Sequence, residues 1–169
     1  MMGAKLTLRP YRAEDAKSVL TWCTDERAFY QWTAGILGPW PPTEAAFAFV
    51  EGLTPFIAEA AERPAGFFTL RQPEKTKKEL RFGFVILDPA LRGRGFGREM
   101  LRLGMDYAFQ VCGADAVTLG VFENNLQAYR CDRAAGFREV LLSPAETYSV
   151  LGEEWPCRDM RRDRTDRRG

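Results

Sequence analysis

A chain of 169 residues with 46% apolar and 28% charged residues has the size and composition of one globular domain. Its formal net charge of +1 gives no general attraction to nucleic acids or membranes, and no apolar run approaches the ~20 residues of a membrane-spanning helix. The absence of histidine excludes Ser-His-Asp and Cys-His hydrolases in their usual form, and histidine metal sites.

The cysteines give no sign of a disulfide framework or a metal site. Cys23, Cys112, Cys131 and Cys157 form no C-x-x-C pair, a spacing that favours reduced thiols. The opening residues, MMGAKLTLRP, lack the apolar segment of a secretory signal. We therefore expect a cytoplasmic protein that holds no metal and binds neither nucleic acid nor membrane.

The hydrophobic pattern alternates between strands and helices. Strand patterns cover 5–10, 55–60, 65–71, 80–87, 116–122, 137–142 and 153–161. Helices are predicted over 13–23, 25–32, 43–52 and 126–135, and from a glycine-rich loop to about residue 111. Because a strand, a helix and a strand follow one another across 80–122, we expect these two strands to be parallel. We predict one α/β domain over 1–162 and a charged, disordered tail over 163–169.

The stretch from Leu80 to Val111 carries the strongest functional signal. An apolar strand leads through an Asp-Pro turn into the sequence RGRGFG, which runs into a helix. Gly93, Gly95 and Gly97 allow the backbone N–H groups to approach a ligand closely, and the start of the helix carries partial positive charge. The arrangement predicts an anion site, and the usual guest of such a site is a phosphate.

Two common phosphate-binding motifs do not match this loop. A P-loop would require a Lys followed by Ser or Thr, and neither is present. A dinucleotide fingerprint starting at Gly93 would place its third glycine at position 98, which is Arg98. That fingerprint should also follow the first strand of the sheet, whereas this loop follows about the fourth.

The string DPALRGRGFGREML instead resembles the acetyl-CoA loop of the GNAT N-acetyltransferase superfamily, with Arg92, Gly95 and Gly97 at its defining positions. Further on, ENNLQAYRCDRAAGF is similar to the second signature of that family, and it places Asn125, Ala128, Gly136 and Phe137 in register. The opening LTLRPYRAEDA also resembles the first strand and helix of the family. The pattern is most similar to the branch that contains ribosomal-protein N-terminal acetyltransferases (RimJ/RimL-like) and aminoglycoside 6′-acetyltransferases.

The resemblance implies a mixed α/β fold and a CoA site. The fold would be an about seven-stranded, mostly antiparallel sheet with splayed parallel central strands 4 and 5, and about four helices. Acetyl-CoA would be the co-substrate, and no metal would take part. The implied cofactor-binding residues are Val85, Ile86 and Leu87 through their backbone, the loop residues Arg92, Gly93, Arg94, Gly95, Phe96, Gly97 and Arg98, and Asn125.

The implied reaction is direct transfer of the acetyl group to a primary amine, with a backbone N–H near Val85 or Ile86 stabilising the oxyanion. The family's usual general acid, a Tyr, would fall at position 132, which is Asp132. Three accounts are open: Asp132 is the acid if burial raises its pKa, the thiolate departs unassisted, or transfer is poor. Glu79 and Glu123 are the candidate bases, with water as an equal alternative.

Aromatic residues in a Gly/Pro-rich setting, Tyr30, Trp32 and Trp40, are candidates for the acceptor pocket or for packing of the loop onto the core. The acceptor would be a peptide N-terminus or a small-molecule amine, and the protein a monomer or homodimer. The alternatives are a non-catalytic CoA-binding module and a structural or interaction domain. Stabilisation by acetyl-CoA and release of free thiol with amines would separate these three hypotheses.

Overall fold

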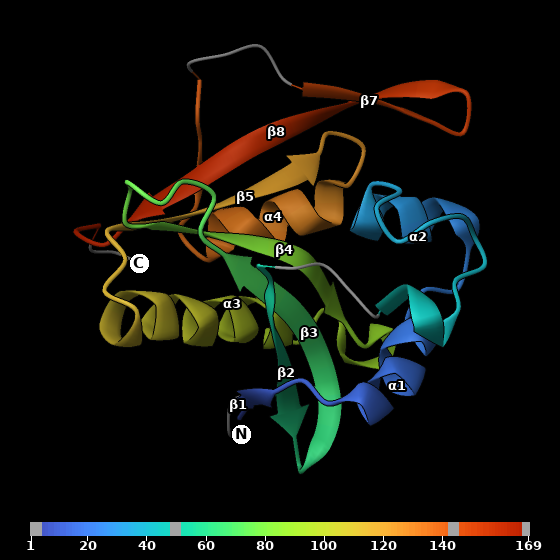
Figure 1. The fold of residues 1–169 in the computed structure, drawn as a ribbon, viewed down its shortest axis with the longest axis horizontal. Coiled ribbons are helices and arrows are strands. Elements are labelled where there is room, and N and C mark those ends of the chain that lie inside the picture. Colours follow the sequence, from blue (N-terminus) through green and yellow to red (C-terminus); the bar gives the residue numbers. More distant parts are fainter. Residues whose placement is uncertain (1–4, 48–51, 142–145, 167–169) are drawn as a thin grey trace.

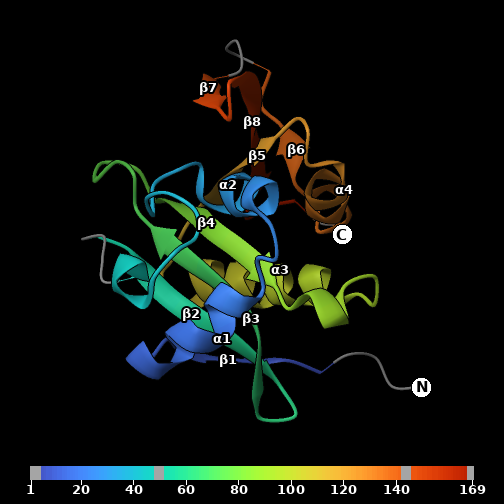
Figure 2. The same cartoon turned by 90° about the vertical axis from the view of Figure 1, so that its right-hand side faces the viewer.

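The computed structural model describes residues 5–47, 52–141 and 146–166, and within them one eight-stranded sheet with helices on both faces (Figures 1 and 2). The strands are β1 (Thr7–Pro10), β2 (Thr54–Ala60), β3 (Arg63–Arg71), β4 (Glu79–Leu87), β5 (Ala116–Phe122), β6 (Arg138–Glu139), β7 (Glu146–Val150) and β8 (Glu153–Asp163). The α-helices are α1 (Ala16–Thr21), α2 (Glu26–Thr33), α3 (Phe96–Asp106) and α4 (Leu126–Ala134). Short 3₁₀ turns lie at Ala13–Asp15, Glu44–Phe47 and Pro89–Leu91, and a π-turn at Tyr107–Val111 extends α3.

The sheet has the predicted parallel centre and opens beyond it. Its order is β1-β2-β3-β4-β5-β8-β6, with β7 paired to β8, and every pairing except β4–β5 is antiparallel. The parallel pairing joins only Glu79–Arg81 to the residues 116–118. Beyond Arg81 the two strands have no partners in each other, although β4 continues to Leu87 and β5 to Phe122. The centre of the sheet is therefore split toward the carboxyl ends of both strands.

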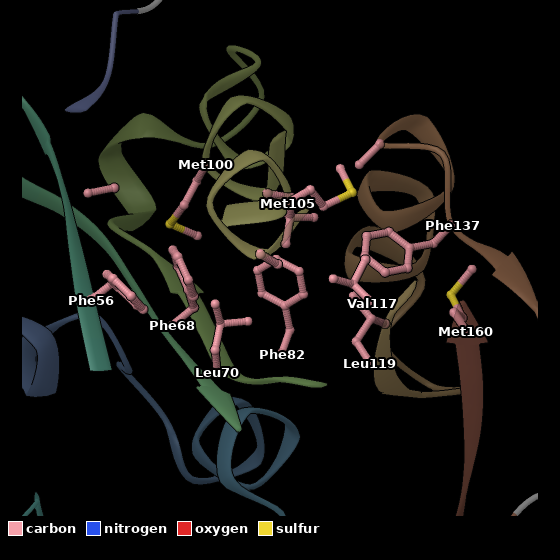
Figure 3. Packing of buried hydrophobic residues seen from close by; sticks show 14 of the residues in the cluster. Phe56, Phe68, Leu70, Phe82, Met100, Met105, Val117, Leu119, Phe137 and Met160 are labelled. Carbon is pink, nitrogen blue, oxygen red and sulfur yellow. The ribbon is translucent and has the colours of Figure 1, made fainter. Parts of the chain in front are cut away.

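Two apolar cores cover the two faces of this split sheet. One core packs β-strand residues against α3 and α4, and Figure 3 shows Phe68, Phe82, Met105 and Phe137 converging there. The other core lies under α1 and α2. The first core is tightly closed at Gly104 of α3, where a Cβ would stand 2.6 Å from a ring carbon of Phe82. A helix without a side chain at this point can approach the aromatic rings of the sheet closely.

An irregularity in β4 exchanges the two faces of the strand. The register with β3 shifts between Phe67 and Thr69, so that Phe84 and Val85 have no Cα partner in β3. Phe84 adopts φ 50°, a region that costs a non-glycine residue about 1–3 kcal/mol. The extra residue is a β-bulge. Before it Phe82 faces the α3 core; after it Phe84 and Ile86 pack in the α1/α2 core while Val85 packs on the α3 side.

The structure departs from the sequence-based expectations in several places. The strand predicted over 137–142 is, among the described residues, only the two-residue β6. The sheet has one strand more than the seven predicted, because β7 forms an antiparallel hairpin with β8. The predicted helix over 43–52 is a 3₁₀ turn at Glu44–Phe47, and 48–51 lie outside the described residues. β8 extends to Asp163, and the Arg164 amide donates to the Asp115 carbonyl at 2.8 Å, so the order reaches past residue 162. Among the described residues, no helix is both long enough and apolar enough to cross a membrane.

Candidate functional site

A cavity of about 490 Å³ occupies the gap where β4 and β5 separate. Its walls include Val85, Ile86 and Leu87 from β4 and the residues 119–122 from β5. One side of the lining comes from the glycine-rich loop, α3 and α4, and the other from α2 and from Trp22 and Cys23, which follow α1. Because these helices cover opposite faces of the sheet, the cavity passes through the sheet and connects its two sides.

The glycine-rich loop forms one end of the cavity. Gly93 and Gly95 adopt φ 76° and 86°, left-handed conformations that a glycine takes without strain. Gly95 is the N-cap of α3, and the first intrahelical bond runs from the Glu99 amide to its carbonyl at 3.1 Å. The N–H groups of the helical turn before Glu99 therefore lack intrahelical partners and carry the positive end of the helix dipole. The loop thus has the backbone geometry of an anion site.

The arginines of the loop have different surroundings. Arg92 and Arg98 both line the cavity, and Arg92 also donates to the Leu87 carbonyl at 3.2 Å. Arg94 does not line it; its guanidinium lies 5.5 Å from the centre of the Phe96 ring, which is itself buried. Two arginines and the start of α3 therefore provide the positive charge at the cavity, and Arg94 points elsewhere.

Asn125 and Asp132 enter the cavity from α4. The Asn125 side chain is the N-cap of α4 and accepts a hydrogen bond from the Ala128 amide at 3.3 Å. Asp132 is only 6% exposed, and its carboxyl makes no hydrogen bond or ion pair with any of the described residues. Burial raises the pKa of Asp132 from 3.8 to about 7. The cavity therefore contains a carboxyl that titrates near neutral pH.

Comparison with known proteins identifies the family. Residues 5–138 match the model of the acetyltransferase (GNAT) domain, which is more than half of the chain. The chain belongs to the GNAT acetyltransferase family. Its fold is similar to the crystal structure of a spermidine N-acetyltransferase from Vibrio cholerae in complex with CoA and spermine, with a TM-score of 0.78 and 18% identity over 95% of this chain and 96% of that one. A structure provisionally assigned as a phosphinothricin N-acetyltransferase has a TM-score of 0.73 and 19% identity, over 96% and 100%.

The family takes its acetyl group from acetyl-CoA, and the site has the features that this co-substrate requires. A pyrophosphate needs a cradle of N–H groups with positive charge, which the loop, Arg92 and Arg98 offer. A pantetheine arm needs backbone partners, and the part of β4 that faces the split has none in β5. Of the residues predicted for the CoA site, the cavity brings together nine and leaves out Arg94 and Phe96. Among the described residues, no cluster of His, Cys, Asp or Glu is suited to a metal ion.

Both carboxylates predicted as bases in this GNAT protein lie outside the cavity lining. Glu79 is at the closed, paired end of β4 and β5, where it forms an ion pair with Arg161 at 2.8 Å. Glu123 follows β5 and is paired with Arg158. The sequence places Glu79 on the strand that lines the cavity, but it does not show that β4 and β5 separate at the opposite end of that strand.

The predicted acceptor residues divide in the same way. Trp32 lines the cavity, whereas Tyr30 and Trp40 pack against the α1/α2 core and are joined by a 3.1 Å hydrogen bond from the Trp40 amide to the Tyr30 hydroxyl. The cavity also includes residues that were not predicted: Trp22, Cys23, Ala28 and Gln31. The spacing of Ala28, Gln31 and Trp32, three and four residues apart along one face of a helix, is the sequence signal that could have found part of this set.

Proposed function

We propose that this protein is an N-acetyltransferase that moves an acetyl group from acetyl-CoA directly to a primary amine. The observation that carries the proposal is the cavity that passes through the split sheet. The glycine-rich loop lies at one side, and Ala28, Gln31 and Trp32 of α2 lie at the other. A donor bound on the α3/α4 side and an acceptor bound on the α2 side could therefore meet between β4 and β5 without passing through bulk water.

The binding roles follow from the lining. The loop and Arg92 hold the pyrophosphate, with Arg98 at the first turn of α3. The backbone of Val85–Leu87 pairs with the pantetheine amides, as a strand edge without a neighbour can do. Asn125 acts mainly by fixing the start of α4, because its side-chain oxygen is engaged with the Ala128 amide.

In the proposed reaction a neutral amine attacks the thioester carbonyl, the new C–N bond forms, and the C–S bond breaks as the thiolate leaves. The N–H of Val85, a residue of the bulge that has no Cα partner in β3, stabilises the negative charge on the carbonyl oxygen. Asp132 gives its proton to the departing thiolate, and the proton lost by the amine passes to water. Water is the proposed base because neither Glu79 nor Glu123 lines the cavity.

The acceptor is an amine on a largely uncharged body, and a peptide N-terminus is the form that fits best. Among the described residues Asp132 is the only carboxyl in the lining, and the α2 side is formed by Trp22, Cys23, Ala28, Gln31 and Trp32. A polyamine or an aminoglycoside carries several positive charges and needs several carboxylates to bind tightly. The lining therefore favours the ribosomal-protein branch of N-terminal acetyltransferases over the aminoglycoside branch.

Two measurements test the proposal. Acetyl-CoA should raise the melting temperature of the protein, because a ligand that binds only the folded state stabilises it. A panel of tripeptides, aromatic monoamines, spermidine and an aminoglycoside should then release free CoA thiol, fastest with the first two classes. Stabilisation without thiol release from any amine would indicate a non-catalytic CoA-binding module. Absence of stabilisation would leave only a structural domain, and faster turnover of spermidine would refute the assignment of the acceptor.

A further inference from the structure

A side chain of α2 contacts the bulge in β4 from outside the sheet. The Trp32 indole Nε1 donates a 2.8 Å hydrogen bond to the carbonyl oxygen of Phe84, the residue with φ 50°. The two rings also meet edge to face, with centroids 6.3 Å apart. An unusual backbone conformation persists only where its surroundings determine it, and here Trp32 supplies both a hydrogen bond and a packing contact.

This hydrogen bond fixes more than one atom, because a peptide bond is planar and trans. Its carbonyl and its N–H point in opposite directions, so the direction of the Phe84 carbonyl sets that of the Val85 N–H. The Trp32 ring packs against the α1/α2 core, and its N–H donates to the Phe84 carbonyl on that side of the sheet. The Val85 N–H is consequently directed away from α2, toward the side of the sheet on which the glycine-rich loop and α4 lie.

The helix that carries Trp32 is anchored on both sides of the split. Gln31, one residue earlier, donates to the Asn124 side-chain oxygen at 3.1 Å, in the turn that follows β5. At the start of α2, Arg27 pairs with Glu153 at 3.2 Å, and its guanidinium lies 5.0 Å from the centre of the Trp155 indole. Helix α2 therefore bridges the two diverging strands. Its Gln31 and Arg27 contact the segment after β5 and the strand β8, and its Trp32 contacts β4.

We propose that Trp32 is a positioning residue for the oxyanion donor: its indole N–H orients the peptide between Phe84 and Val85 so that the Val85 N–H faces the thioester oxygen. The inference rests on the proposed function, since it concerns the same reaction. It assigns to α2 a role in the chemical step in addition to its place in the wall of the acceptor side. Trp32 itself touches no reacting atom in this account.

The test removes the indole N–H and keeps the ring. Trp32→Phe does this most simply, and β-(3-benzothienyl)alanine at position 32 preserves the bicyclic shape if the smaller ring affects folding. The matched control is Trp40→Phe, because the Trp40 ring also packs against the α1/α2 core but does not line the cavity and takes no part in the Gln31 and Arg27 contacts that anchor α2. The readouts are kcat, the KM for acetyl-CoA, and the infrared carbonyl band of bound acetyl-CoA carrying ¹³C at the thioester carbon.

We expect the Trp32 variants to lose kcat by ~10-fold, less than the effect of deleting an oxyanion donor, while the KM for acetyl-CoA changes by less than about twofold. The carbonyl band should shift to lower frequency on binding to the parent protein and to the Trp40 variant, and this shift should be lost in the Trp32 variants. An unchanged band in the Trp32 variants, or a kcat equal to that of the control, would overturn the inference and leave the proposed function intact. A shifted band in a parent protein that acetylates no amine would refute the proposed function and support the positioning role.

Discussion

Replacing Asp132 with Asn should stabilise the protein at alkaline pH and leave its stability nearly unchanged in acid. The carboxyl is 6% exposed and has no hydrogen-bond partner among the described residues. Burial raises its pKa from 3.8 to about 7, because the charged form loses its hydration without gaining a partner. An asparagine keeps the size and the polarity of the protonated acid but cannot ionise.

The magnitude follows from linkage between protonation and folding. Below about pH 4 the carboxyl is protonated in both the folded and the unfolded chain, and it contributes no pH dependence. Between about pH 4 and 7 the unfolded chain loses the proton that the fold retains, so the free energy of unfolding decreases as pH rises. A pKa that rises from 3.8 to about 7 corresponds to about 4 kcal/mol, and this loss is complete above pH 7.

Urea denaturation followed by tryptophan fluorescence at pH 4.5, 6 and 8 would measure this difference. We expect the Asp132→Asn protein to exceed the parent by up to about 4 kcal/mol at pH 8 and by little at pH 4.5. Asp115→Asn is the control, because Asp115 is exposed and lies outside the cavity. Parallel pH profiles for the parent and the Asp132 variant would show that the carboxyl is not isolated, and would refute the reasoning about its proton.

Other predictions test the packing, the anion site and the thiols. Gly104→Ala should lower the free energy of unfolding by about 1–3 kcal/mol in urea titrations, because its Cβ would meet the Phe82 ring at 2.6 Å; an unchanged value would mean that the ring yields freely. Arg92→Ala should raise the Kd for acetyl-CoA by ~10-fold in calorimetry, with a smaller effect for Arg94→Ala, and equal effects would contradict their different placement. Iodoacetamide at pH 7.5 should label the exposed Cys112 first, as read by mass spectrometry, because burial raises the pKa of the other three thiols to about 11.

Local patterns were sufficient for most of the fold. The strand, glycine loop and helix between Leu80 and Val111 are contiguous in sequence, so propensity, capping and phosphate geometry all point to one arrangement. The helix predicted over 25–32 is α2, and Asp25 begins it as the N-cap, with its carboxyl accepting from the Ala28 amide at 2.8 Å. The two signatures together specified the parallel pair β4–β5, and the family match confirms what they implied about the fold.

What the sequence could not give depends on contacts between distant segments. Nothing in the sequence around Phe84 marks a bulge, because the hydrogen bond to its carbonyl comes from Trp32, 52 residues earlier in the chain. Glu79 was predicted as a base because it begins the central strand β4. Its ion pair with Arg161 depends on the position of β8 in the sheet, which the local sequence does not give. The strand β7 was also missed, because most of its residues are exposed, only its last residue is buried, and its sequence therefore gives little of the apolar pattern that indicates a strand.

In the proposed mechanism, the departure from the family signature at Asp132 need not remove the chemistry. A thiol has a pKa near 8.5 and a phenol near 10, so a tyrosine would give up its proton to a departing thiolate against a difference of about 1.5 pKa units. A carboxyl whose pKa is about 7 would transfer the proton in the favourable direction. In the proposed reaction the same burial that reduces stability at pH 8 retains part of this proton near pH 7, so the asparagine variant should be the slower enzyme at pH 7 and the more stable protein at pH 8.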